Sequence, residues 1–448
     1  MQTIEFTGKL TEADTKRHIS HVFTVPDGVQ SIAIDLMHAP HKAADQPYPN
    51  QVSLSLFDPN GSRGARHNNQ DQSIKLIHHN ASKGYLPGPL VPGEWDVVLD
   101  THRILGDDFT YTITVTLSEE PVPDDMPTNY IPGTTADRGA GWYRGDLHSH
   151  TNHTDGKLDV VELAQYARDF KLDFLALTDH NTVSPLAEFH SYADDDLITI
   201  GGMELTTYYG HCLALGTSEW QEWRLVNGLT MPDLAQRIMD TGAFYVIAHP
   251  RSIGDPRCTG CRWEFEDMMP GNAPAVEVWN GLWNERNAEG VALFYEWLNA
   301  GHRLVCTAGT DLHAYPRGNI RGAAVNVVYA EHYSAGGILA GLHKGNSYLS
   351  AGPTLSMKLS DENVNTALIG DTLPGSTVSY DITVSDYAPG DTLRVIADGH
   401  VLETVSLDEC EHVEGRQSPN RWMTFEVHDE TGDMRLITNP VFVTLPSE

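Results

Sequence analysis

The sequence predicts a multidomain protein in which a central domain of alternating strands and helices lies between two β domains. At 448 residues the chain is long enough for roughly two to four domains. Short β-branched and aromatic runs fill the first 120 residues and return after residue 353, whereas the residues between them alternate between apolar runs and helical patterns. We place the domains at 1–138, 139–352 and 353–448.

The first domain has the pattern of a β-sandwich. Its strand-like runs are short, and most are bounded by Gly, Pro, Asn or Asp; they lie at 3–6, 19–25, 31–37, 52–57, 95–99 and 109–117. Several such runs without a convincing long helix predict two packed sheets. A stretch rich in Pro and Gly over 121–141 predicts the linker that follows.

The central domain alternates between the two kinds of pattern. Helices are expected at about 160–170, 232–240 and 285–299, and strands at 174–177, 197–201, 244–248, 275–279, 304–307 and 323–328. Repeated units of this kind predict parallel strands in a barrel or a doubly wound sheet. The third domain returns to strands, at 378–384, 393–397, 423–427 and 441–445, and predicts a smaller β domain.

Charge and composition narrow the function. With 61 acidic and 29 basic residues the net charge is −32, which repels phosphate backbones and anionic membranes. We therefore expect a small-molecule substrate and neither nucleic acid nor membrane as a partner. The first residues lack an apolar run suited to a signal peptide, so a cytoplasmic location is expected. The β domains would cover the central domain or build a homo-oligomer interface, and carbohydrate binding is a further alternative for the first.

The candidate functional residues begin in the segment 145–156. His148 and His150 are two apart in an extended run, so both side chains can point at one metal ion, and Asp155 follows in a turn. Later apolar runs are also followed by residues of the types that bind metal ions. These residues are His180, Glu204 with His211, His249, and Asp311 with His313.

These nine side chains would meet at one rim if the strands form a parallel barrel. Burying so many His, Asp and Glu groups without a cation would be costly. Imidazole and carboxylate without thiolate suit Zn, Mn or Fe, and permit two or three divalent ions.

The order of these segments resembles the PHP (polymerase and histidinol phosphatase) superfamily. The motif Asp-Leu-His-x-His-Thr-x-x-Ser-Asp-Gly is present at 146–156 with Thr154 in place of Ser, and the later motifs are Thr-Asp-His at 178–180, Glu204, His249-Pro250 and Asp-x-His at 311–313. The resemblance implies a distorted (β/α)7 barrel that binds two or three metals. Shorter matches resemble the CehA/McbA-like branch: Gly202-Met-Glu-Leu-Thr-Thr with Gly210-His, Gly345-Asn-Ser-Tyr-Leu-Ser-Ala-Gly-Pro, and Thr438-Asn-Pro-Val.

The resemblance also implies a ligand set for each ion. The first ion would be held by His148, His150, Glu204 and Asp311, and the second by Asp155, His180 and His313. Glu204 would join His211 and His249 on a third.

The expected activity is hydrolysis of an ester. Metal ions lower the pKa of bound water from about 15.7 toward about 7 and so supply hydroxide at neutral pH. We expect Asp311 to accept a proton from that water and Arg251 to bind a phosphate substrate, with Arg144, Arg317 and Arg321 as further candidates. A small-molecule phosphoester is the favoured substrate, and a carboxylic or carbamic ester is the alternative.

The two substrate classes predict different pockets. Two or more Arg or Lys beside the metals would favour the phosphoester, whereas an uncharged pocket using Tyr208, Tyr209, Trp279 or Trp283 would favour the other ester. A protein that only binds is disfavoured because the ligand motifs are intact. Cys258 and Cys261 are expected to form a loop disulfide or to stay free thiols, since a structural zinc needs four ligands.

Overall fold

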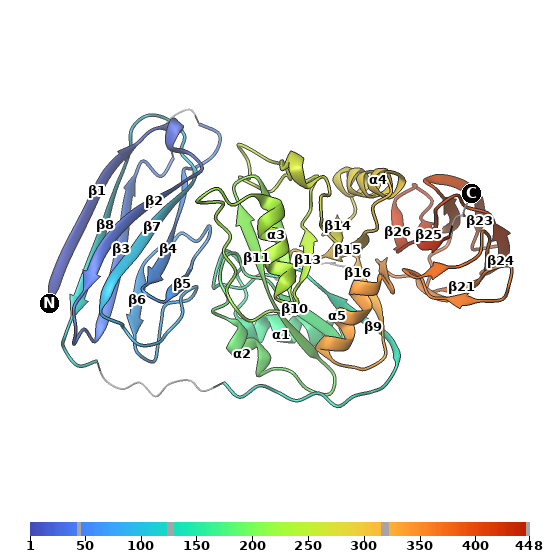
Figure 1. Cartoon of the computed structure of the whole chain (residues 1–448), viewed down its shortest axis with the longest axis horizontal. Coiled ribbons are helices and arrows are strands. Elements are labelled where there is room, and N and C mark those ends of the chain that lie inside the picture. The colour runs from blue at the N-terminus through green and yellow to red at the C-terminus, as the bar shows by residue number, and fades with distance from the viewer. Residues whose placement is uncertain (43–45, 123–129, 315–321, 445–448) are drawn as a thin grey trace.

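The computed structural model describes residues 1–42, 46–122, 130–314 and 322–444 and arranges them as three domains in a row (Figure 1). The protein is multidomain and mostly β, and every α-helix of the described residues belongs to the central domain. No helix in these ranges is long and apolar enough to cross a membrane.

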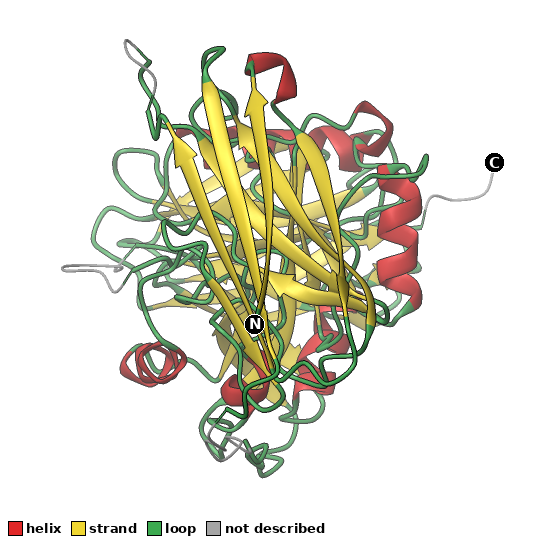
Figure 2. Cartoon of the chain, turned by 90° about the vertical axis from the view of Figure 1, so that its left-hand side faces the viewer, coloured by secondary structure: helices red, strands yellow, loops and turns green. Residues whose placement is uncertain are grey.

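The N-terminal domain is a β-sandwich of two antiparallel four-stranded sheets, whose long strands face the viewer in Figure 2. Side chains of a strand point alternately to the two faces of its sheet, and every second residue of β8 from Phe109 to Leu117 is buried in the core of the sandwich. The predicted strands are present, and the short β5 and β6 were not predicted. One sheet is β1 (Gln2–Leu10), β8 (Phe109–Ser118), β3 (Ser31–Ala39) and β6 (Ile74–Ile77), and the other is β2 (Arg17–Val25), β7 (Gly93–Arg103), β4 (Gln51–Asp58) and β5 (Gly61–Ala65).

The central domain is built on a sheet of mixed direction. In spatial order its strands are β15 (Val305–Gly309), β14 (Ala275–Asn280), β13 (Phe244–Ile247), β12 (Gly210–Leu215), β11 (Ile198–Thr207), β10 (Phe174–Leu177), β9 (Gly141–Asp146), β16 (Val325–Ala330) and β17 (Ser347–Ser350). Strands β9 to β11 are parallel, and so are β13 to β15. Strands β11 and β12 form an antiparallel hairpin. Strand β12 runs opposite to both of its neighbours, and β16 runs opposite to β9 and β17, so the sheet is not wholly parallel as predicted.

Within the described residues, five α-helices accompany this sheet: α1 (Val160–Asp169), α2 (Leu186–His190), α3 (Met231–Asp240), α4 (Glu285–Asn299) and α5 (Ala335–Lys344). The three predicted helices are among them, and two of these begin with capping boxes, Asp159 with Glu162 and Thr230 with Asp233. Helix α5 was not predicted, because Gly336 and Gly337 weaken its helical pattern.

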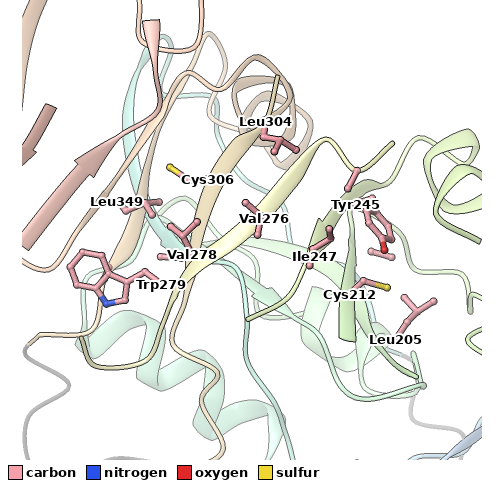
Figure 3. Close-up of a cluster of buried hydrophobic side chains, with 14 of the residues drawn as sticks. Leu205, Cys212, Tyr245, Ile247, Val276, Val278, Trp279, Leu304, Cys306 and Leu349 are labelled. Carbon is pink, nitrogen blue, oxygen red and sulfur yellow. The ribbon is translucent and has the colours of Figure 1, made fainter. Parts of the chain in front are cut away.

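Apolar side chains of β11 to β15 form the core that fixes these strands. Leu205, Cys212, Ile247, Val276 and Cys306 come from five successive strands of the sheet and are fully buried (Figure 3). Close packing of this kind restricts side-chain movement. The strand ends above it are therefore held in fixed relative positions.

The C-terminal domain continues the central sheet. Strand β17 pairs with β26, so ladder hydrogen bonds run from one domain into the next. The strands of the C-terminal domain are β18 (Thr354–Ser360), β19 (Thr366–Ala367), β20 (Thr372–Leu373), β21 (Val378–Ser385), β22 (Thr392–Ala397), β23 (His400–Ser406), β24 (His412–Gln417), β25 (Trp422–His428), β26 (Met434–Thr438) and β27 (Val441–Val443). Asn439 also reaches the central domain, where its amide hydrogen-bonds both the N–H and the carbonyl of Cys306.

The core predicts a difference between two isoleucines of the central domain. Ile247→Ala should lower the free energy of unfolding by about 2–5 kcal/mol, because it leaves a cavity in a fully buried position. Ile253→Ala, at a residue 38% exposed, should have a much smaller effect. Urea unfolding followed by tryptophan fluorescence measures both, and equal losses would contradict this account of the core.

Candidate metal centre

The nine predicted ligands meet at one end of the central sheet. Most are buried, and Asp311 and His313 are partly exposed, with 26% and 38% of their side-chain surface accessible. They come from the loop after β9 (His148, His150, Asp155), the end of β10 (His180), β11 (Glu204), β12 (His211), the end of β13 (His249) and the loop after β15 (Asp311, His313).

Glu204 lies at the middle of this group. Its two oxygens lie close to five imidazoles: Oε2 is 3.1 Å from His148 Nε2, 3.3 Å from His150 Nε2 and 3.0 Å from His180 Nδ1, and Oε1 is 2.9 Å from His211 Nδ1 and 3.1 Å from His249 Nε2. Burial acts to raise the pKa of Glu204, but the neighbouring imidazoles hold it well below its usual range. The carboxylate therefore stays ionised although no water reaches it.

Two further carboxylates complete the centre. Asp155 Oδ1 is 3.3 Å from His180 Nε2 and 3.2 Å from His313 Nε2. Asp311 Oδ1 is 3.0 Å from His150 Nε2 and 3.4 Å from His313 Nδ1. Against the effect of burial, the imidazoles also hold the pKa of each aspartate well below its usual range.

The ligand atoms fall into small groups whose members lie within 4.8 Å of one another. One group is the set expected for the first ion, and a second joins His150 to the set expected for the second ion. The remaining two differ from the expected third set, because His211 is grouped with His180 and Glu204, and His249 with His148 and Glu277.

The donor atoms fit divalent cations. Five of the nine side chains have buried atoms with no hydrogen-bond partner in the described part of the chain: His148 Nε2, both nitrogens of His150, Asp155 Oδ1, Glu204 Oε2 and His211 Nε2. Leaving such atoms unpaired is costly. A mixture of imidazole nitrogen and carboxylate oxygen is the set that zinc, manganese and iron accept.

Two buried aspartates of the motifs hold the ligand loops in place. Asp146 accepts hydrogen bonds from the backbone N–H of His148 and from the N–H and hydroxyl of Thr310, and its burial raises its pKa to about 6. Asp179 accepts the hydroxyls of Thr151 and Thr154. Thr154, which replaces the serine of the motif, thus supplies the same hydroxyl. Neither aspartate was predicted to have a role.

Glu277 is the carboxylate that sequence reasoning missed. Its Oε1 lies 3.0 Å from His148 Nδ1, and its Oε2 accepts the backbone N–H of His249 and the amide of Asn280. Gly309 is required beside it, because a Cβ there would lie 2.1 Å from Glu277 Oε1. The available signal was a single carboxylate inside the apolar run 275–279.

His249 is fixed from its other side by a turn closed by a disulfide. Its Nδ1 donates to the carbonyl of Cys261, which is disulfide-bonded to Cys258, and Nε2 is left facing Glu204. The backbone of His249 has φ of 28° and that of Asp311 has φ of 52°. Non-glycine residues rarely adopt such angles, and they persist where the surrounding structure enforces them.

A pocket opens beside His249. Its lining includes Arg251 and Arg286 together with Asn280 and Asn284. The other candidate arginines lie elsewhere: Arg144 donates to the carbonyl of Phe170, and Arg317 and Arg321 fall outside the described residues. None of the four aromatic candidates lines this pocket, and Tyr208 and Trp279 are buried in packing.

Comparisons with known proteins give a partial match. No family model matches the chain. An uncharacterized protein of Methanocaldococcus jannaschii, MJ1295, is 30% identical over 114 residues, which is 25% of this chain and 48% of that protein, so the chain spans about half of its length.

Two solved structures resemble the chain at low TM-scores. A two-domain protein from Bacteroides vulgatus containing a predicted PHP-like metal-dependent phosphoesterase has a TM-score of 0.38 and 16% identity, over 70% of this chain and 98% of that one. An amidohydrolase from Chromobacterium violaceum has a TM-score of 0.29 and 18% identity, over 38% of this chain and 87% of that one. These values are too low to transfer an activity.

Removing the charge of Glu277 should lower the affinity of the centre for metal ions. Glu277→Gln should weaken binding of a divalent ion by about 10- to 100-fold, because His148 loses the carboxylate that orients its ring. Glu285→Gln, at an exposed position of α4, is the matched control and should bind as the wild type does. Competition with a chelator measures both, and equal affinities would exclude this role for Glu277.

The imidazoles predict that metal binding displaces protons. Burial acts to lower the pKa of His148 and of His180, but nearby carboxylates raise both well above the usual range, and those around His313 raise its pKa to about 9. Affinity should therefore rise between pH 6.5 and 8.5, by about tenfold per pH unit for each proton displaced. Calorimetry in buffers of different ionisation enthalpy should show the released protons, and a pH-independent affinity would contradict the prediction.

Proposed function

We propose that the protein is a metal-dependent phosphoesterase of the PHP superfamily that acts on a small-molecule phosphate ester. The observation that carries the proposal is the pocket beside His249, whose lining includes two guanidinium groups and this one member of the nine-residue cluster. The ordered motifs support the family, and we infer that the central domain is a distorted form of its barrel.

The pocket chemistry favours phosphate over an uncharged ester. A guanidinium presents paired N–H donors that match two phosphate oxygens, and hydrogen bonds between charged groups are stronger than neutral ones. Arg251 lines the pocket, and its Nε has no hydrogen-bond partner among the described residues. Asn280 and Asn284 add neutral donors to the same pocket.

The residues of the centre would have different roles in the reaction. Two or three divalent ions, of Zn, Mn or Fe type, would be held by the nine side chains, and when bound they lower the pKa of water and neutralise charge on the phosphoryl oxygens. Arg251 would orient the ester beside His249. Asp311, whose Oδ2 is 3.4 Å from the Asn280 amide, would take the proton of the attacking water.

The proposal predicts hydrolysis of p-nitrophenyl phosphate or bis-p-nitrophenyl phosphate by protein loaded with Mn or Zn. The double variant His148→Ala/His150→Ala should lose activity by at least about 100-fold. Arg251→Gln and Arg286→Gln should each lower kcat/KM by about 10- to 100-fold, since each removes a charged hydrogen-bond donor.

Arg257→Gln is the control for the arginines, because its side chain is exposed in the same loop and does not line the pocket. Protein that binds metal and cleaves aryl acetates or aryl carbamates, but neither phosphate ester, would sink the phosphoesterase proposal. It would then favour the alternative ester hydrolase.

A further inference from the structure

The N-terminal sandwich is seated on the metal end of the central domain. A loop of the sandwich between β5 and β6 donates hydrogen bonds to the first metal motif: the amide of Asn69 binds the carbonyl of Thr154 at 2.6 Å. Nearby, Lys83 Nζ binds Asn152 Oδ1 at 2.7 Å, and the N–H of Gly84 donates to His153 Nδ1 at 3.3 Å. The contact is thus polar and directed at the segment that supplies three of the nine candidate ligands.

Two successive residues of this loop contact candidate ligands themselves. The amide of Asn68 donates to Asp155 Oδ2 at 3.1 Å, and the ring of His67 is 4.7 Å from that of His180. His67 is buried, and its Nδ1 has no hydrogen-bond partner among the described residues.

The two oxygens of Asp155 therefore have different surroundings. Oδ2 is held by Asn68, while Oδ1 is buried and faces His180 and His313. This is the arrangement expected of a carboxylate that ligates through one oxygen while an outer partner orients the other.

The backbone conformation of Asn68 favours this contact. Asn68 has φ of 51°, in the left-handed region that asparagine tolerates better than most residues. This conformation places its amide against Asp155 across the domain boundary. Neither residue can be linked to the other from sequence spacing, because 87 positions separate them.

We propose that Asn68 is a positioning residue of the metal centre, so that the sandwich forms part of the site for the ion held by His150, Asp155, His180 and His313. The inference rests on the proposed metal-binding function and adds a dependence on the N-terminal domain. The neighbouring group of His148, His150, Glu204 and Asp311 is oriented from within the central domain, by Glu277 and Asn280. The two ions would therefore differ in their sensitivity to the sandwich.

Metal titration of the full chain tests this. Asn68→Gly keeps the left-handed backbone accessible and removes only the amide. It should lower the affinity for one Zn or Mn ion by about tenfold and leave the affinity for the others unchanged. The expected loss is at the low end of the range for outer partners because Asn68 is exposed. Asn68→Asp, which also tolerates this conformation, replaces the donor by a second carboxylate beside Asp155. It should weaken the same ion, and both variants should unfold at the wild-type temperature when metal-free.

The matched control is Asn69→Gly, which removes an amide bound to a backbone carbonyl instead of a ligand. It should bind metal as the wild type does. Equal loss in Asn69→Gly and Asn68→Gly would show that the sandwich acts only by docking, and no loss in either Asn68 variant would also overturn the proposal. Wild-type protein that binds metal but hydrolyses no phosphate ester would defeat the proposed function and leave this inference standing. Wild-type protein that takes up no metal would defeat both.

Discussion

Glu204 is fully buried and lies within 3.3 Å of nitrogens from five imidazoles, and an isolated carboxylate in that position would cost several kcal/mol. The other features of the site bring partners to this buried carboxylate and hold them there. The five histidines come from four separate strand ends or strands, so those strands must converge, and the apolar wall of β11 to β15 holds them there. Asp146 and Asp179 then tie the loops between them, and Glu277 restrains His148 from behind.

Much of this could be predicted from the sequence because the signals are local. His148 with His150, and Asp311 with His313, are two apart in extended segments, and each later ligand follows an apolar run. Most strand and helix positions were predicted for the same reason. What could not be predicted depends on long-range geometry. Strand β12 runs opposite to both of its neighbours, and the role of Glu277 becomes evident only when β14 lies beside the loop after β9. The placement of Asn68 on Asp155 has no local signal at all.

The two candidate ion groups share His150, and the N-terminal domain contacts two ligands of the second group. Glu277 and Asn280 belong to the same sheet as the ligands they restrain. Asp155 and His180 are in addition contacted by a domain with its own two sheets and a separate apolar core. A single site thus combines a part fixed by the folding of one domain with a part fixed by the docking of another. Relative movement of the two domains would disturb the second group before the first.

The pairing of β17 with β26 gives the C-terminal domain a different kind of attachment. The sandwich meets the central domain through side chains and single backbone groups, whereas here the two domains share one hydrogen-bonded ladder, and Asn439 extends the link to Cys306. A chain cut near residue 352 would leave β17 as an open strand edge, which is a template for pairing with other molecules. Removal of the C-terminal domain would therefore expose the protein to self-association.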